Sequence, residues 1–170
     1  DQIDIIYSVE EETTGSVGGT IGYSDFGLML GFNLQEKNFF GTGNTVGIGI
    51  NKNIYSEVYN LSFMDPYATK DGVSLGYNIY FRETDYGEFN VANYLTNSNG
   101  FGAQFGYPTS DITRLGFNLT YDKTDIDIGT LPAREIYDFV SKEGNVFETV
   151  TAQFSWQRVT LNRGLFPTAG

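Results

Sequence analysis

Apolar and polar side chains alternate with a period of two along most of this sequence. This period is typical of a β-strand with one apolar and one polar face, whereas an amphipathic helix has a period of 3.6. Leu28, Leu30, Phe32 and Leu34, for example, are separated by Met, Gly and Asn. The pattern predicts eight strands, at residues 16–23, 28–35, 45–51, 59–63, 73–82, 101–107, 114–121 and 150–157.

The connections between these strands carry turn-forming residues. Short turns rich in Gly, Asn, Asp, Ser and Pro are expected at residues 24–25, 41–44, 71–72 and 108–111. Short turns join antiparallel neighbours, so we expect an all-β, antiparallel, up-and-down arrangement. The longest insertion, residues 127–147, contains a segment at 132–139 that is expected to form a short helix in an exposed loop.

The two faces of the predicted strands differ in an informative way. One face is Val, Leu, Ile, Phe and Tyr, and the other is mostly Gly, Ser, Thr, Asn and Gln, with charges placed in the connections, including residues 122–127. A soluble barrel normally covers its outer face with charged side chains. An uncharged polar face opposite an apolar face indicates strands that cross a membrane, with lipid on the apolar side. We therefore expect a transmembrane β-barrel.

Aromatic side chains lie near many of the predicted strand ends. At the two membrane interfaces they would form the aromatic girdles of a barrel, although the general preference of Tyr and Phe for strands also explains them. The residues concerned are Tyr23, Phe39, Phe40, Tyr55, Tyr67, Tyr86, Tyr94, Tyr107 and Phe166.

Composition narrows the function further. The 170 residues contain no Cys and no His, which removes thiol nucleophiles, imidazole bases and most zinc sites, so we expect no enzyme activity, no metal and no cofactor. The net charge of −11 opposes nucleic-acid binding. The longest apolar stretch, residues 26–32, is far shorter than the roughly 18 residues of a membrane-spanning helix. The mean hydropathy of −0.24 does not separate a soluble protein from a transmembrane barrel.

The small inner side chains bear on the size of the barrel. A closed barrel of about eight strands fills its interior with side chains, and a lining of Gly, Ser, Thr and Asn would leave a void. We therefore expect these eight strands to be part of a wider barrel. The chain starts at Asp1 without Met or a signal peptide, so we also expect a processed protein or a piece of a longer one.

The first twelve residues differ from the rest. They alternate like a strand but end in three consecutive carboxylates at Glu10, Glu11 and Glu12, which do not enter a bilayer. Residues 1–12 are thus expected to be the last strand of a preceding soluble domain, and residues 13–170 the barrel part.

Four groups of connecting residues, in this order along the chain, resemble the BamA family, the outer-membrane protein assembly factors of Gram-negative bacteria. The groups run from Asn38 to Asn44, from Asp65 to Gly76, from Gly106 to Pro108 and from Leu161 to Gly170. Within them, the family-motif turn residues are Phe39, Gly41, Gly43, Asp65, Pro66, Tyr67, Asp71, Gly72, Arg163, Gly164, Pro167 and Gly170.

The resemblance implies a barrel of about sixteen strands that folds and inserts other β-barrel proteins. This chain would supply the end of the last POTRA domain, at residues 1–12 on the periplasmic side, and the first half of the barrel, at residues 13–170. The implied partners are client outer-membrane β-barrel proteins, the lipid bilayer, and assembly-complex lipoproteins held through the missing POTRA region.

A barrel of this kind closes by pairing its first and last strands. The segment from Thr14 to Tyr23, at the first predicted strand, has four glycines, which weaken a strand, so its seam is expected to open more easily than the others. An incoming client strand would then pair with the exposed edge by β-augmentation. An equally good explanation is that these glycines only allow the sheet to curve. The expected client-pairing edge is Thr14, Gly15, Ser16, Val17, Gly18, Gly19, Thr20, Ile21, Gly22 and Tyr23.

Three other functions remain open at this point. A related POTRA-barrel secretion transporter shares the architecture, and a diffusion porin would show a large, steady conductance. A soluble lipocalin-like binding protein would stay monomeric without detergent.

Overall fold

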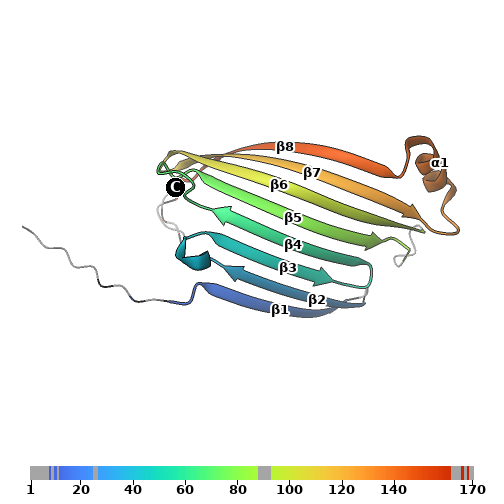
Figure 1. The fold of residues 1–170 in the computed structure, drawn as a ribbon, viewed down its shortest axis with the longest axis horizontal. Coiled ribbons are helices and arrows are strands. Elements are labelled where there is room, and N and C mark those ends of the chain that lie inside the picture. The colour runs from blue at the N-terminus through green and yellow to red at the C-terminus, as the bar shows by residue number, and fades with distance from the viewer. Residues whose placement is uncertain are drawn as a thin grey trace, which may run out of the picture.

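The computed structural model describes residues 8, 10, 12–24, 27–87, 93–161, 166 and 168. Its eight strands form one antiparallel sheet in which each strand lies beside its neighbours in the sequence (Figure 1). This confirms the predicted all-β, up-and-down order. The elements are β1 (Gly15–Ser24), β2 (Gly27–Glu36), the 3-10 turn η1 (Phe39–Gly41), β3 (Thr45–Lys52), β4 (Ser56–Asp65), β5 (Ser74–Asp85), β6 (Tyr94–Ser110), β7 (Thr113–Ile128), α1 (Arg134–Glu143) and β8 (Val146–Arg158).

The strand register places apolar side chains directly opposite one another across the whole sheet. One such row runs without a break from β1 to β8 and consists of Val17, Leu34, Ile48, Leu61, Ile79, Phe101, Tyr121 and Val150. Because side chains alternate between the two faces of a strand, the whole row lies on one face. Of the hydrophobic residues that the structure describes, Val73 alone is buried, so this apolar face is not covered by a second layer of the protein.

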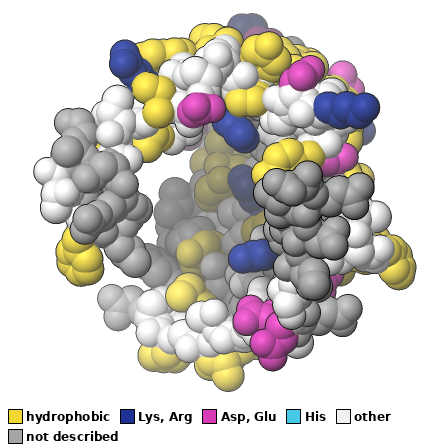
Figure 2. Space-filling model, turned by 90° about the vertical axis from the view of Figure 1, so that its left-hand side faces the viewer, with side chains coloured by type: hydrophobic (Ala, Val, Ile, Leu, Met, Phe, Trp, Pro, Cys, Tyr) yellow, Lys and Arg dark blue, Asp and Glu magenta, His cyan; other side chains and the backbone are white. Residues whose placement is uncertain are grey.

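The opposite face carries small polar side chains. Its corresponding row is Ser16, Gln35, Gly47, Ser62, Asn78, Gly102, Thr120 and Thr151. The sheet is curled around a hollow, with hydrophobic side chains gathered on its outer surface (Figure 2). The polar face lines this hollow, and one concavity of about 430 Å³ has Ser16, Asn33, Gln35, Asn60 and Ser62 among its walls.

Inner-face glycines and polar side chains fit together in pairs. Gly100 illustrates the arrangement, because a Cβ atom placed there would lie 2.6 Å from the ring of Tyr80, the residue directly opposite on β5. The Tyr80 ring therefore lies over the glycine, and the Arg82 guanidinium lies 5.6 Å from the same ring. The empty space expected from a Gly-rich lining is in this way partly taken by side chains lying flat on the neighbouring strand.

Strands β6 and β7 are longer than the sequence pattern predicted. Residues 94–100 were not included in any predicted strand, and residues 122–127 were predicted to lie in a connection, yet both segments belong to the sheet. They pair with each other, as in Asn97 opposite Asp125 and in the 2.9 Å hydrogen bond between the Ser98 and Thr124 hydroxyls. The prediction was wrong because backbone pairing does not require an apolar face, and these residues have none.

Two connections also differ from their predicted bounds. Residues 108–110 belong to β6, with a register irregularity between Pro108 and Ser110, so the turn predicted at 108–111 is shorter than expected. The long insertion spans residues 129–145, because β7 ends at Ile128 and β8 begins at Val146. It contains the expected helix, α1, whose Phe139 ring stacks on Phe147 at 5.4 Å. No helix among the described residues is long and apolar enough to cross a membrane.

Candidate functional site

Strand β1, like β8 on the opposite side, is an edge strand of the sheet. It pairs with β2 along its full length, from Gly15 opposite Glu36 to Ser24 opposite Gly27, and no described strand pairs with its other side. An edge strand presents backbone N–H and C=O groups that can pair with another strand. The predicted client-pairing residues 14–23 thus fall on an edge, with Thr14 just before the strand and residues 15–23 within it.

The side chains of β1 are more exposed than their counterparts within the sheet. Val17 is 71% exposed and Ile21 is 80% exposed, whereas Leu61 on β4 is 48% exposed although it lies in the same apolar row as Val17. The difference arises because a strand inside the sheet is flanked on both sides and β1 is flanked on one. A second strand beside β1 would bury much of this apolar area.

One end of β1 is anchored to β2. The Thr14 hydroxyl donates a hydrogen bond to Glu36 Oε1, and the Lys37 N–H donates to the Thr14 carbonyl at 3.3 Å. Glu36 Oε1 also accepts a hydrogen bond from the Asn38 N–H at 3.0 Å. This polar cluster fixes the point at which β1 enters the sheet, and the sequence pattern had not singled out Glu36.

The first of the family-motif turns is a compact structure stabilised by its own hydrogen bonds. The Asn38 side-chain oxygen accepts from the Gly43 N–H at 2.7 Å, and the Phe39 N–H donates to the Asn44 carbonyl at 2.9 Å. Gly41 and Gly43 have φ values of 75° and 76°, a region that side chains rarely adopt. Glycine at these two positions is therefore required by the turn.

The second motif turn joins β4 to β5. Asp65 Oδ1 accepts a hydrogen bond from the Tyr67 N–H at 3.0 Å, across Pro66. Gly72 has a φ of 78°, and a Cβ atom there would lie 3.4 Å from Pro108 on β6. Tyr67, Asp71 and Gly72 line one concavity together with the turn that follows β6, so the structure brings these motif residues together. Of the remaining motif residues, Arg163, Gly164, Pro167 and Gly170 lie outside the described residues.

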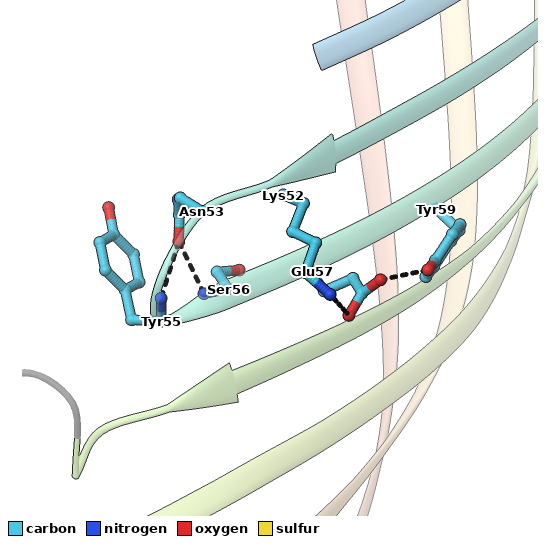
Figure 3. Close-up of polar contacts among 6 residues, drawn as sticks. All are labelled: Lys52, Asn53, Tyr55, Ser56, Glu57 and Tyr59. Atoms are coloured by element: carbon cyan, nitrogen blue, oxygen red, sulfur yellow. Dashed lines mark hydrogen bonds and ion pairs between the residues drawn. The ribbon is translucent and has the colours of Figure 1, made fainter. Parts of the chain in front are cut away.

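At the other end of the strands lies a polar cluster that the alternating sequence pattern does not indicate. Lys52 Nζ and Glu57 Oε2 form an ion pair at 3.0 Å, and the Tyr59 hydroxyl donates to Glu57 Oε1 (Figure 3). In the turn between them, Asn53 Oδ1 accepts from the backbone N–H groups of Tyr55 and Ser56 at 3.1 and 2.7 Å. An Asn at the start of a short connection, whose side chain accepts from backbone N–H groups two and three residues on, was the available sequence signal for this turn.

This cluster marks a boundary on the outer face. The register continues from Lys52 and Glu57 to Glu83, Asn97 and Asp125, all of which share the face of the apolar row. The outer face thus changes from apolar to charged along one row of residues. Such a change is expected where a lipid-facing surface meets water.

Comparison with known proteins identifies the family of this sheet. The Omp85 superfamily domain matches residues 38–170, which is more than half of the chain. This chain belongs to the Omp85 superfamily. The matched range starts at the motif turn of Asn38 and includes β3 to β8.

Two curated Omp85 relatives carry the name outer membrane protein assembly factor BamA. The protein from Neisseria meningitidis serogroup B is 28% identical over 181 residues, covering 100% of this chain and 23% of its own length. The protein from Buchnera aphidicola subsp. Acyrthosiphon pisum is 28% identical over 160 residues, covering 88% of this chain and 26% of its own length. This chain therefore spans about a quarter of the length of these relatives.

A solved structure points to the same family as these two relatives. The crystal structure of BamA from Haemophilus ducreyi lacking POTRA domains 1–3 matches with a TM-score of 0.64 and 28% identity, covering 95% of this chain and 33% of that chain. The resemblance to the BamA family that the connecting residues indicated is confirmed, and so is the antiparallel up-and-down barrel fold. The division at residue 12 stays a prediction, and most of residues 1–12 lie outside the described residues.

Proposed function

We propose that this chain forms the first half of a barrel wall in the bacterial outer membrane and that the complete protein folds and inserts other β-barrel proteins. The observation that carries the proposal is that β1 pairs on one side only with a described strand, in a sheet whose outer face carries an unbroken apolar row. The likeness to proteins named BamA supports the same activity. Residues 1–12 would lie on the periplasmic side, next to POTRA domains that bind the assembly lipoproteins.

The outer face explains how the wall resides in lipid. Each of the eight strands places one member of the apolar row on this face, and exposures of 41% for Ile48 and 48% for Leu61 are typical of the members inside the sheet. Transfer of such side chains from water to lipid is worth about 25 cal/mol for each Å² of apolar area. The charged row of Lys52, Glu57 and Glu83 then lies at the interface with water.

The working groups of the mechanism are the backbone amides and carbonyls of β1. In hydrocarbon, an unpaired backbone group costs several kcal/mol because water is not there to pair with it. A client strand that pairs with residues 14–23 removes this cost for both strands, in the manner of β-augmentation. The step needs no nucleotide, metal or covalent intermediate, so the proposed role is not enzymatic.

The glycines of β1 make it suitable as a lateral gate, meaning a seam between two strands of the barrel wall that opens to admit a client strand. Gly15, Gly18, Gly19 and Gly22 contribute no packing side chain, so packing against a strand at the free edge is limited to the other β1 residues, such as Val17 and Ile21. Such a seam exchanges partners more readily than one held by Leu and Phe pairs, such as Phe105 opposite Phe117.

Site-specific cross-linking tests the proposal. The full-length protein would carry Ser16→Cys or Thr20→Cys on β1, or Asn118→Cys on β7 as the control within the sheet. These 170 residues contain no other Cys. We expect disulfides between either β1 position and a Cys in the terminal strand of a folding client barrel, and none at Asn118. Equal cross-linking at all three positions, or cross-linking at Asn118 alone, would rule out β1 as the template.

A further inference from the structure

The inner face of the sheet follows one packing rule. In β2 to β7, every inner-face glycine except Gly27, which begins β2, is covered by the polar, uncharged side chain of the residue directly opposite on an adjacent strand. A Cβ atom built on these glycines would lie 2.2 to 3.2 Å from that side chain. The pairs are Gly31 with Asn51, Gly47 with Ser62, Gly49 with Asn33, Gly76 with Gln104, Gly100 with Tyr80, Gly102 with Asn78, Gly106 with Ser74 and Gly116 with Ser155.

Gly18 on β1 departs from this rule. It lies on the same inner face, but a Cβ atom built there meets no atom within 4 Å. Its opposite residue on β2 is Asn33, which has the right chemistry to cover it. The Asn33 side chain does not cover Gly18, because its Oδ1 lies over Gly49 on β3, 3.2 Å from a Cβ atom built on Gly49.

The vacant position therefore faces the free edge. A residue of a strand has two directly opposite partners, one on each side, and the β2 partner of Gly18 is turned away from it. The other partner would belong to a strand paired with the free edge of β1. The other inner-face glycine of β1, Gly22, does not share this vacancy, because Met29 of β2 lies 3.3 Å from its Cβ position.

We propose that Gly18 is a specificity-determining residue of the β1 edge and that it selects client strands with a polar, uncharged side chain directly opposite. This inference rests on the proposed function, since it names a feature of the strand that the β1 edge accepts. The side chain would lie flat over Gly18, as Ser62 lies over Gly47 and Asn78 over Gly102. Charged side chains take no part in the eight pairs of this sheet and are not expected at the position.

The effect on selection is modest and measurable. A favourable cross-strand pair contributes roughly 0.2–1 kcal/mol, which corresponds to a preference of up to about fivefold. A competition between two strands in one tube resolves a ratio of this size, because both experience the same protein preparation.

The experiment uses the full-length protein in detergent micelles with Ser16→Cys on β1. Synthetic ten-residue strand peptides carry a Cys opposite Ser16, so that the disulfide fixes the register, and Asn, Ser, Gly or Leu at the position opposite Gly18. The peptides compete in pairs, and mass spectrometry counts the cross-linked products. Asn118→Cys on β7 again serves as the control within the sheet.

We expect the Asn and Ser peptides to exceed the Gly and Leu peptides by about three- to fivefold. In a Gly18→Asn variant the preference should reverse toward the Gly peptide, and a Gly18→Ser variant should do the same. Neither variant is expected to impair folding, because the space beside Gly18 is open and the φ angle of Gly18 lies outside the left-handed region.

Two other results have separate meanings. Cross-linking of all four peptides in equal amounts at Ser16, unchanged by Gly18→Asn, would overturn the role of Gly18 and leave the templating edge intact. Cross-linking at Ser16 no greater than at Asn118 would overturn the proposed function and this inference with it.

Discussion

The packing of Tyr80 over Gly100 leads to a prediction that can be worked out from the structure. A methyl group at position 100 would lie 2.6 Å from two atoms of the Tyr80 ring and 2.7 Å from its hydroxyl. The same methyl group at Gly18 meets nothing within 4 Å. Gly100→Ala and Gly18→Ala are therefore a matched pair: the same substitution, on the same face of the same sheet, with and without a clash.

The expected magnitudes follow from two opposing terms. Ala in place of Gly in a strand stabilises by about 0.5–1 kcal/mol, because the unfolded chain has less conformational freedom to lose. At Gly100 the Tyr80 ring must also move by about 1 Å, and forcing extra volume into a packed site costs about 1–3 kcal/mol. Gly100→Ala should lower the free energy of unfolding by about 0.5–2 kcal/mol, whereas Gly18→Ala should raise it slightly.

Urea unfolding in lipid vesicles measures both variants. Trp156 is the single tryptophan of these 170 residues and lies 62% exposed on β8, so its fluorescence reports the loss of the sheet once tryptophans elsewhere in the full-length protein are replaced by Phe. Tyr80→Ala provides the double-mutant cycle, because removal of the ring should abolish the cost of Gly100→Ala. An undiminished cost in the Tyr80→Ala background, or an equal cost for Gly18→Ala, would refute the packing rule.

Three further predictions concern the faces and ends of the sheet. Leu119→Arg on the outer face should destabilise the inserted protein by about 2–4 kcal/mol, whereas Asn118→Arg on the inner face should change the stability little. Similar losses of unfolding free energy for the two variants in a vesicle unfolding assay would contradict the assignment of faces. Asn53→Ala removes the acceptor for two backbone N–H groups and should lower the free energy of urea unfolding by about 1 kcal/mol. An unchanged unfolding midpoint would show that the turn forms without the Asn53 side chain. Lys52→Met breaks an exposed ion pair and should change the unfolding free energy by less than about 1 kcal/mol, and a larger loss would mean that the pair is shielded from water.

Much of the fold follows from local patterning. Leu28, Leu30, Phe32 and Leu34 are sufficient to locate β2, because only an extended chain places all four on one face. The same reasoning located the other seven strands, and the helix was expected separately, within the long insertion. It failed at residues 94–100 and 122–128, where the strands continue without an apolar face and are held by pairing between β6 and β7.

The candidate site could be predicted only in outline. Four glycines within ten residues marked β1 as unusual, and the family-like turns indicated its position at the start of a barrel. The position of β1 at an edge of the described sheet and the anchoring of Thr14 by Glu36 depend on residues brought together by strand pairing. The ion pair of Lys52 with Glu57 arises in the same way, since their register sets them opposite each other.

The sequence by itself determined the period of two, the contrast between the faces and the absence of Cys and His from these 170 residues, because each of these depends on residue type and spacing along one chain. The tertiary structure decided which glycine is covered and which is vacant. Gly18 and Gly49 are alike in sequence, since both are inner-face glycines whose neighbours two positions away on either side are Gly or small polar residues. They differ because Asn33 lies between them and its single side chain turns toward Gly49, leaving Gly18 uncovered beside the free edge.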